Sequence, residues 1–427
     1  MKRPNNTGLI KPNMTASETP ASPQDLGRDG PLTGVRVIDL TSVVFGPYAT
    51  QTLADMGADV IKVEAPDGDI MRAAYPARNP GMSGVYLNAN RNKRGIVLDL
   101  RQPAAQQALN RLIATADVFI HSMRPAAIAK LGFDYATVAA IRPDIVYASA
   151  WGFRSTGPYA DRPAYDDVIQ GISGTADLAR RRGADAPDFA PMVMADKVAG
   201  LHAVAGISMA LFHRGRSGEG QQIEIPMFEA VTSFNFIEHL SGAVFEPPLS
   251  PAGYSRVLDP NRRPHKTADG FMVVLPYNDK QVRGFFSAAD RPDLSNDPRF
   301  ADAPSRSKNV DQFYGLVGEL VATKTTADWV ELLGEADVPA IPVNTLEDVL
   351  DDEHLRATGF ISEYDHPSEG RLRSLGVPLH FEKTPGSARR RHPPRLGEDT
   401  RAVLAENGFT TDEIETLLAD GAARQAE

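Results

Sequence analysis

Short apolar runs alternate with helix-forming stretches from residue 31 onward. The runs are rich in Val and Ile, which favour strands, and glycine or proline bounds many of the stretches between them. This alternation predicts βαβ units and a parallel sheet. The predicted strands span residues 35–40, 59–64, 117–121 and 145–151, and the predicted helices span 47–57, 103–116, 125–130 and 134–141.

A longer helix is predicted over residues 196–214, with Asp196 as its N-cap. A strand at 221–226 and a helix at 228–242 follow it. The apolar positions of the long helix recur every three or four residues, at Val198, Leu201, Ala205, Met209 and Phe212.

The same pattern divides the chain into two domains, joined by linkers. An α/β fold is predicted, with a Rossmann-like, doubly wound large domain and a smaller α+β domain. The predicted parts are a disordered tail at 1–30, the large domain at 31–227, a linker at 228–262 that is Pro-rich from about 243, the small domain at 263–355, and a return linker with C-terminal helices packing on the large domain at 356–427.

The composition and net charge of the chain exclude several kinds of site and partner. Lys and Arg total 45 against 55 Asp and Glu, a net charge of -10, so we expect no nucleic-acid partner. The chain has no cysteine, which excludes disulfides and thiolate metal sites. Its longest apolar stretch, about 198–212, is shorter than the roughly 18–20 residues of a membrane-spanning helix, so we expect no membrane partner. We expect a cytoplasmic protein.

Several common catalytic motifs are missing. The first strand–helix turn, residues 41–47, lacks the G-x-G-x-x-G of dinucleotide-binding folds, which disfavours an oxidoreductase. The nine His have no metal-ligand spacing, and neither G-x-S-x-G nor a P-loop is present, so no metal site is predicted.

Ordered blocks of the chain resemble the class III CoA-transferases, the CaiB/BaiF family that includes formyl-CoA and carnitine transferases. The blocks occur in the order of that family and cover nearly everything after residue 31. They are residues 34–72, 92–100, 120–135, 145–159, 194–231, 328–360 and 395–409.

The resemblance implies a carboxylate nucleophile at Asp196 and an activity that moves CoA between an acyl-CoA and a free carboxylic acid. A mixed anhydride and an aspartyl-CoA thioester would form on that side chain, which divides one exchange into easier steps. The local sequence alone leaves a plain N-cap open. At a helix N-terminus the carboxylate would be kept ionised by the dipole and nearby N–H groups.

CoA would be a substrate and not a permanently bound cofactor. Its phosphates require cations or helix N-termini. Basic candidates, each of which a solvated surface cation would also explain, are Arg72, Lys93, Arg94, Arg101, Arg124 and Lys130. By resemblance the CoA contacts are Val44, Phe45, Leu98, Asp99, Leu100, Arg101, Ser122, Met123, Arg124, Lys130, Trp151, Gly152, Phe153 and Arg154.

The chain departs from the oxalate-handling branch of this family. Val44, Ala65 and Trp151 stand where that branch has Gln, Arg and Lys, and residues 250–254 replace its run of glycines. We therefore expect an acid other than oxalate. The polar residues Ser42, Arg72, Tyr165 and Asp167 would suit a small dicarboxylic acid.

Three alternatives stay open. A sister branch epimerises 2-methylacyl-CoA esters with an acid/base pair, but Tyr165 occupies its His position, and a tyrosine with a pKa of about 10 is a poor base. A non-catalytic CoA-binding protein and a Rossmann oxidoreductase are the others. The resemblance further implies a homodimer whose chains pass through each other like linked rings, which the long linkers would allow.

Overall fold

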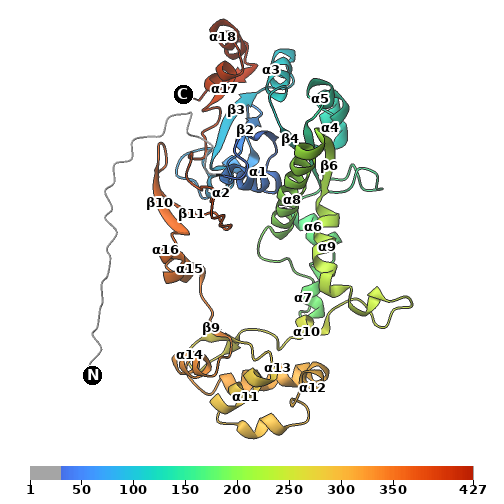
Figure 1. Cartoon of the computed structure of the whole chain (residues 1–427), viewed down its shortest axis with the longest axis vertical. Helices are drawn as coiled ribbons and strands as arrows, with labels where there is room; N and C mark the ends of the chain where they lie inside the picture. The colour runs from blue at the N-terminus through green and yellow to red at the C-terminus, as the bar shows by residue number, and fades with distance from the viewer. Residues whose placement is uncertain (1–29, 427) are drawn as a thin grey trace, which may run out of the picture.

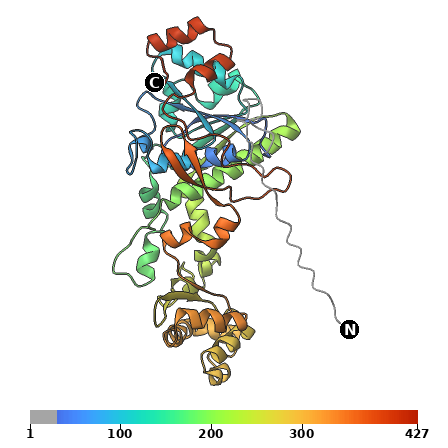
Figure 2. The same cartoon turned by 90° about the vertical axis from the view of Figure 1, so that its left-hand side faces the viewer.

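The computed structural model describes residues 30–426, so the predicted tail, apart from Gly30, lies outside the described residues. Figures 1 and 2 show a large lobe at one end of the long axis and a small lobe at the other. Two arms of the chain join them. The architecture is mixed α/β, as predicted.

The large lobe is built on a seven-stranded sheet. Six strands run parallel, and the last strand of the chain pairs antiparallel at one edge. The predicted strands are confirmed to within one residue at each end. In spatial order they are β12 (Ala423–Arg424), β3 (Lys93–Leu98), β2 (Asp59–Glu64), β1 (Arg36–Leu40), β4 (Val118–His121), β5 (Val146–Trp151) and β6 (Gln221–Pro226).

Helices cover both faces of this sheet (Figure 1). One face packs on α1 (Phe45–Asp55), α6 (Asp166–Ile172), α8 (Met194–Ser217) and α9 (Met227–His239). The other packs on α3 (Pro103–Ile113), α4 (Pro125–Lys130), α5 (Tyr135–Ile141), α17 (Thr400–Glu406) and α18 (Thr411–Ala419). Between β2 and β3 the chain forms η2 (Ile70–Ala73) and α2 (Gly84–Asn90).

Helix α8 differs from its prediction in its packed face. Of the predicted apolar positions Val198 is buried, whereas Leu201, Met209 and Phe212 are 53%, 65% and 66% exposed. Small residues pack inward instead, because α1 comes so close that a Cβ on Gly200 would lie 3.1 Å from the carbonyl oxygen of Phe45. The larger side chains therefore lie on the opposite face.

Helix α8 is the one helix among residues 30–426 that is long and apolar enough, by length and composition, to cross a membrane. The core helix of a soluble protein meets the same criterion. Here α8 packs against α1, β5, β6 and α9 as part of the core of the large lobe.

The small lobe has its own core around Trp329, whose ring stacks on Phe285 with centroids 5.9 Å apart. Helices α11 and α12 were not predicted. Its elements are β7 (His265–Lys266), β8 (Phe271–Val274), α11 (Asp279–Ala288), η4 (Pro292–Asn296), α12 (Ala303–Lys308), α13 (Val310–Val321), α14 (Thr326–Glu335) and β9 (Ala340–Pro342).

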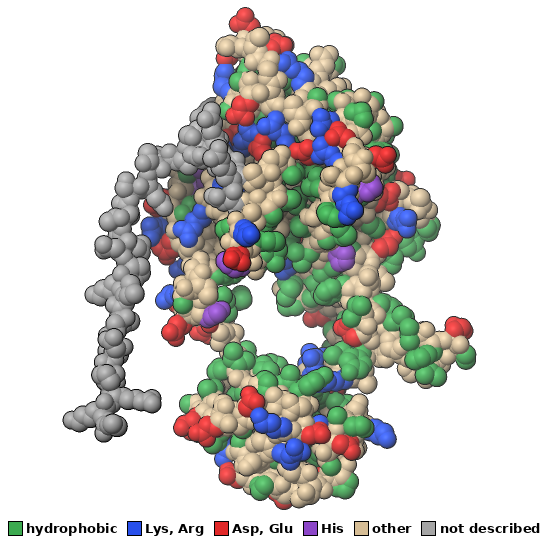
Figure 3. Space-filling view, viewed as in Figure 1, with side chains coloured by type: hydrophobic (Ala, Val, Ile, Leu, Met, Phe, Trp, Pro, Cys, Tyr) green, Lys and Arg blue, Asp and Glu red, His purple; other side chains and the backbone are tan. Residues whose placement is uncertain are grey.

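The two arms leave an opening between the lobes, and the space-filling view shows that side chains do not fill it (Figure 3). The return segment, expected to be loop-rich, contains a β-hairpin. The outgoing arm carries α7 (Asp177–Arg181), η3 (Ser241–Val244) and α10 (Ser255–Leu258), and the return arm carries α15 (Leu346–Leu350), α16 (Glu353–Ala357), β10 (Ile361–His366) and β11 (Gly370–Leu375).

Candidate active site

A cavity of about 390 Å³ opens at the carboxyl ends of β1, β4 and β5. The strand order reverses between β1 and β4, and ligands of open α/β sheets bind at such a point. The side chains that define it come from the loops after these strands and from α8, and include Ser42, Val43, Phe45, Ser122, Met123, Arg124, Trp151, Gly152, Arg162, Tyr165, Asp196 and Met227.

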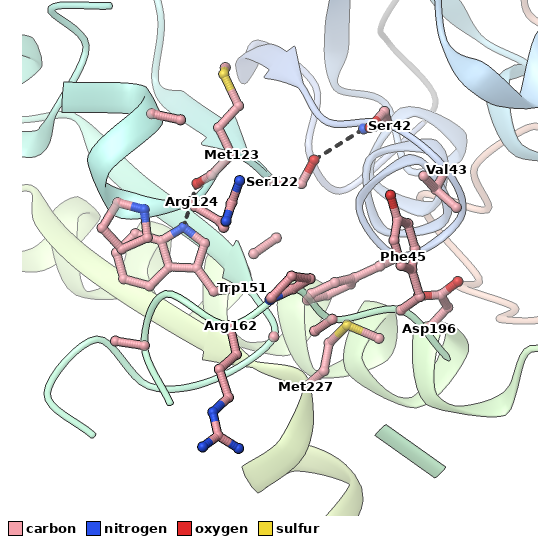
Figure 4. Close-up of a pocket in the computed structure, with 18 residues that line it drawn as sticks. Ser42, Val43, Phe45, Ser122, Met123, Arg124, Trp151, Arg162, Asp196 and Met227 are labelled. Atoms are coloured by element: carbon pink, nitrogen blue, oxygen red, sulfur yellow. Dashed lines mark hydrogen bonds between the residues drawn. The ribbon is translucent and has the colours of Figure 1, made fainter. Parts of the chain in front are cut away.

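Asp196 lies in the wall of this cavity beside Phe45 (Figure 4). It is the third residue of α8 and not its N-cap, which is Val193. The side chain is 6% exposed, and no described residue donates a hydrogen bond to its carboxylate. Burial, with a contribution from Asp166, raises its pKa to about 7. The expectation of a carboxylate held ionised by its helix is therefore wrong.

The sequence did not single out Asp166, a buried neighbour in the first turn of α6. Its Oδ1 accepts the backbone N–H of Asp196 at 3.0 Å, and its Oδ2 accepts the side-chain amide of Gln170 at 2.6 Å. Asp167, the residue named from sequence, is exposed. The two acidic residues are adjacent, so only their burial distinguishes them.

Hydrogen bonds between loops shape the cavity walls (Figure 4). The indole N–H of Trp151 donates to the carbonyl oxygen of Met123 at 2.8 Å. The backbone N–H of Ser42 donates to Ser122 Oγ at 3.2 Å. These bonds tie the loop after β4 to the end of β5 and to the loop after β1.

A second cavity, of about 480 Å³, shares Ser42, Ser122 and Met123 with the first. The predicted CoA segment 98–101 lines it. Arg101 has an 80% exposed side chain and pairs with Asp99 at 2.7 Å. Most of the predicted CoA residues thus come together on one continuous surface that reaches Asp196.

Arg72 does not join this surface. Its guanidinium is buried and donates two 2.7 Å hydrogen bonds to Glu64, and its carbon lies 3.8 Å from the ring centre of Tyr86. Lys93 and Arg94 are likewise buried in ion pairs, with Asp39 and Asp59. Cations whose donors are occupied by protein acceptors are not available to a phosphate.

Four other predicted contacts lie outside the linings of the two cavities. Phe153 is buried in the core, where its ring contacts those of Tyr159 and Phe228. Lys130 and Arg154 are exposed. Val44 is the N-cap of α1. Among residues 30–426 no three His, Asp or Glu side chains are grouped to hold a metal.

At the switch point of an open α/β sheet, one cavity contains the buried carboxylate of Asp196 and adjoins a second cavity, which leaves room for an elongated ligand beside that carboxylate. The family model described as CoA-transferase family III matches residues 32–400. The chain belongs to CoA-transferase family III, and the transferase class predicted from the sequence is confirmed.

Curated relatives agree with this assignment. The chain is 34% identical over 397 residues to a succinate–glutarate CoA-transferase from Agrobacterium fabrum, which covers 89% of this chain and 96% of the relative. It is 30% identical over 408 residues to the human succinyl-CoA:glutarate CoA-transferase, covering 94% and 92%. A formyl-CoA:oxalate CoA-transferase from a Bradyrhizobium strain is 30% identical over 429 residues, covering 92% and 97%.

Solved structures show the same fold. A CaiB/BaiF family protein from Brucella suis superposes with a TM-score of 0.75 at 31% identity, covering 89% of this chain and 100% of that one. The protein Rv3272 from Mycobacterium tuberculosis superposes with a TM-score of 0.74 at 28% identity, covering 88% and 99%.

Proposed function

We propose that this enzyme transfers CoA between small dicarboxylic acids, with Asp196 as the covalent nucleophile. One observation carries the proposal. Asp196 presents a buried carboxylate, without a hydrogen-bond donor among the described residues, to a cavity that continues into the surface formed by the predicted CoA segments. A carboxylate that is buried to this degree and has only a structural role would accept hydrogen bonds or pair with a cation.

The reaction proceeds by exchange at two carbonyl groups. A carboxylate oxygen of Asp196 attacks the thioester carbon, the C–O bond forms, and the C–S bond breaks to give a mixed anhydride and CoA thiolate. The thiolate then attacks the side-chain carbonyl of Asp196, which forms the aspartyl-CoA thioester and releases the donor acid. The acceptor carboxylate repeats these steps in reverse. No proton is gained or lost overall.

The pocket suits this chemistry in two ways. A carboxylate with a pKa of about 7 is a stronger nucleophile than an ordinary one, yet about half of it is ionised at neutral pH. Arg124 and Arg162 also line the cavity and supply positive charge for anionic substrates. These two arginines support an acid with a second carboxylate.

The relatives support the same substrate class. Two of those described above are named for succinate or succinyl-CoA and glutarate. The formyl-CoA:oxalate enzymes are relatives at about the same identity, but Val44, Ala65 and Trp151 differ from the residues expected for that branch. We therefore place succinyl-CoA and glutarate first among candidate pairs.

Intact-protein mass spectrometry tests the proposal. Wild type, Asp196→Asn and Asp185→Asn are mixed with succinyl-CoA, and the adduct is mapped after mild hydroxylamine treatment. Asp185 is an exposed aspartate outside the cavity and serves as the matched control. A CoA-sized adduct on Asp196, present in wild type and the control and absent from Asp196→Asn, is expected. Glutarate should discharge it.

Two other results would redirect the assignment. An adduct discharged only by oxalate would replace glutarate with oxalate as the acceptor acid. No adduct with any ester, together with exchange of the α-proton of 2-methylacyl-CoA into deuterated water, would favour the epimerase.

We further propose that the large domain is Rossmann-like and doubly wound and that two chains form interlocked rings. The strand order and the helices on both faces support the first point. The opening between the lobes supports the interlocked rings. So do the exposed apolar side chains of α8 and α9, among them Met209, Phe212 and Ile237, of which Ile237 is 86% exposed. The proposal includes a cytoplasmic location and no bound cofactor, nucleic acid or membrane.

Interlocking has a specific consequence. Linked rings cannot exchange subunits without unfolding, so two differently tagged preparations mixed in native buffer should form no hybrid dimers. Unfolding and refolding the mixture should produce them. A monomer mass at micromolar protein, or hybrids formed in native buffer, would contradict the linked arrangement.

A further inference from the structure

Val43 has a backbone conformation that its side chain disfavours. Its φ is +72°, in the left-handed region, where a β-branched residue is a genuine outlier. The residue lies in the loop between β1 and α1 and lines the cavity that contains Asp196. Such strain persists only where the surrounding structure enforces it, and it concentrates at functional sites.

Asp69 enforces this conformation through three hydrogen bonds. Its Oδ1 accepts the backbone N–H of Val43 at 3.1 Å and that of Met71 at 3.0 Å. Its Oδ2 accepts Lys62 Nζ at 2.9 Å. The carboxylate and the ammonium are 1% and 0% exposed, so neither can exchange its partner for water.

Lys62 holds the same loop two residues before Val43. Its Nζ also donates to the carbonyl oxygen of Thr41 at 2.8 Å. Asp39 in turn accepts the backbone N–H of Thr41 at 2.9 Å and lies 3.3 Å from Lys93 Nζ. The loop is therefore fixed at Thr41 and at Val43 by buried charges of opposite sign.

The position of this loop matters because α1 begins directly after it. The first turn of α1 packs on α8 at Gly200, where a Cβ would lie 3.0 Å from the ring of Tyr48. Asp196 is one helical turn before Gly200. A displaced loop would move the cavity wall relative to Asp196.

We propose that Asp69 and Lys62 are positioning residues that hold Val43 in its left-handed conformation and thereby align the wall of the CoA cavity with Asp196. The role rests on the proposed function, because the alignment serves the attack of Asp196 on a bound acyl-CoA. Neither residue lines the cavity that contains Asp196, and Asp69 borders the adjoining CoA cavity. The hydrogen bonds of the pair reach the wall beside Asp196 through the backbone of residues 41–43.

A double-mutant cycle tests the coupling. Asp69→Asn keeps the size of the side chain, but places an amide N–H against either Lys62 or the two backbone donors. Val43→Gly removes the cost of a positive φ. The rate of thioester formation from succinyl-CoA is measured per folded enzyme in the wild type, both single variants and the double variant.

Asp69→Asn is expected to slow thioester formation by about 30-fold with Val at position 43 and by less than about threefold with Gly there. If Asp69→Asn alone does not fold, the double variant should still fold and react. Asp55→Asn is the matched control, since Asp55 is a buried, Arg91-paired aspartate at the far end of α1. It should lower the melting temperature without any dependence on residue 43.

The proposal would be overturned if Asp69→Asn slowed thioester formation equally with valine and with glycine at position 43. An Asp69→Asn variant with the wild-type rate would also overturn it. A wild type that forms no thioester with any ester would instead refute the proposed function. In that case the affinity of the same four proteins for CoA alone is measured by calorimetry. The loss of affinity caused by Asp69→Asn should again be smaller when Val43→Gly is also present.

Discussion

Replacing the proposed nucleophile should stabilise the protein, and the gain should depend on pH. Asp196 is 6% exposed, and burial is the largest cause that raises its pKa from 3.8 to about 7. The folded state therefore holds a proton that the unfolded state has already released. Stability from this group is fully present below pH 3.8 and is lost as the pH rises to about 7. Asp196→Asn, which is neutral and of equal size, removes this loss.

The magnitude follows from the two pKa values at 1.36 kcal/mol per pH unit. The ionisation of Asp196 lowers the free energy of unfolding by about 2 kcal/mol at pH 5 and by about 4 kcal/mol at pH 8. The free energy of unfolding of Asp196→Asn, relative to wild type, should therefore increase by roughly 2–3 kcal/mol between these two pH values.

Urea unfolding at pH 5, 6, 7 and 8 measures this difference. Protein concentration is kept constant, because oligomerisation shifts apparent stability. Asp185→Asn removes an exposed aspartate and should show a difference that does not change with pH. The reasoning is refuted if Asp196→Asn differs from wild type by the same amount at every pH, since Asp196 would then ionise at an ordinary pKa in the folded state.

Three further predictions concern the site. Thioester formation should slow about tenfold per pH unit below about pH 7, and Asp166→Asn should move this limb to lower pH, because Asp166 is the smaller cause of the raised pKa of Asp196; a pH–rate profile in which both enzymes coincide would exclude the coupling. Gly152→Ala should cost about 1–3 kcal/mol in thermal unfolding, because its Cβ would lie 2.1 Å from that of Ala164, and Ala164→Gly should restore the stability. Arg101→Ala should raise KM for acyl-CoA about fivefold with kcat unchanged; steady-state kinetics with unchanged KM would place the phosphates elsewhere.

The helices and strands were largely predictable because their signals are local. The apolar runs at β1, β2 and β5 and the capping box of Thr410 with Glu413 in α18 appear in the structure where the sequence places them. The hairpin of β10 and β11 was missed, because its strands are polar and partly exposed and show no clear alternation.

Part of the candidate site was predictable because the blocks that resemble the family cover most of the chain. They identified Asp196 and the segments at 98–101 and 122–124, which line the joined cavities. They also included Arg72 and Phe153, whose side chains are buried among protein partners. A contact list derived from resemblance gives positions along the chain, and burial decides which of those side chains remain available.

The sequence by itself determined the family, the order of helices and strands, and the single acidic residue at the start of α8, because each is encoded in contiguous residues. Only the tertiary structure decided the chemistry of that residue. The pKa of Asp196, the pairing of Asp166 with its backbone, and the strained loop at Val43 arise from segments that are 26 to 30 residues apart in the sequence. Desolvation and like-charge repulsion depend on distance in space, and no local pattern records them.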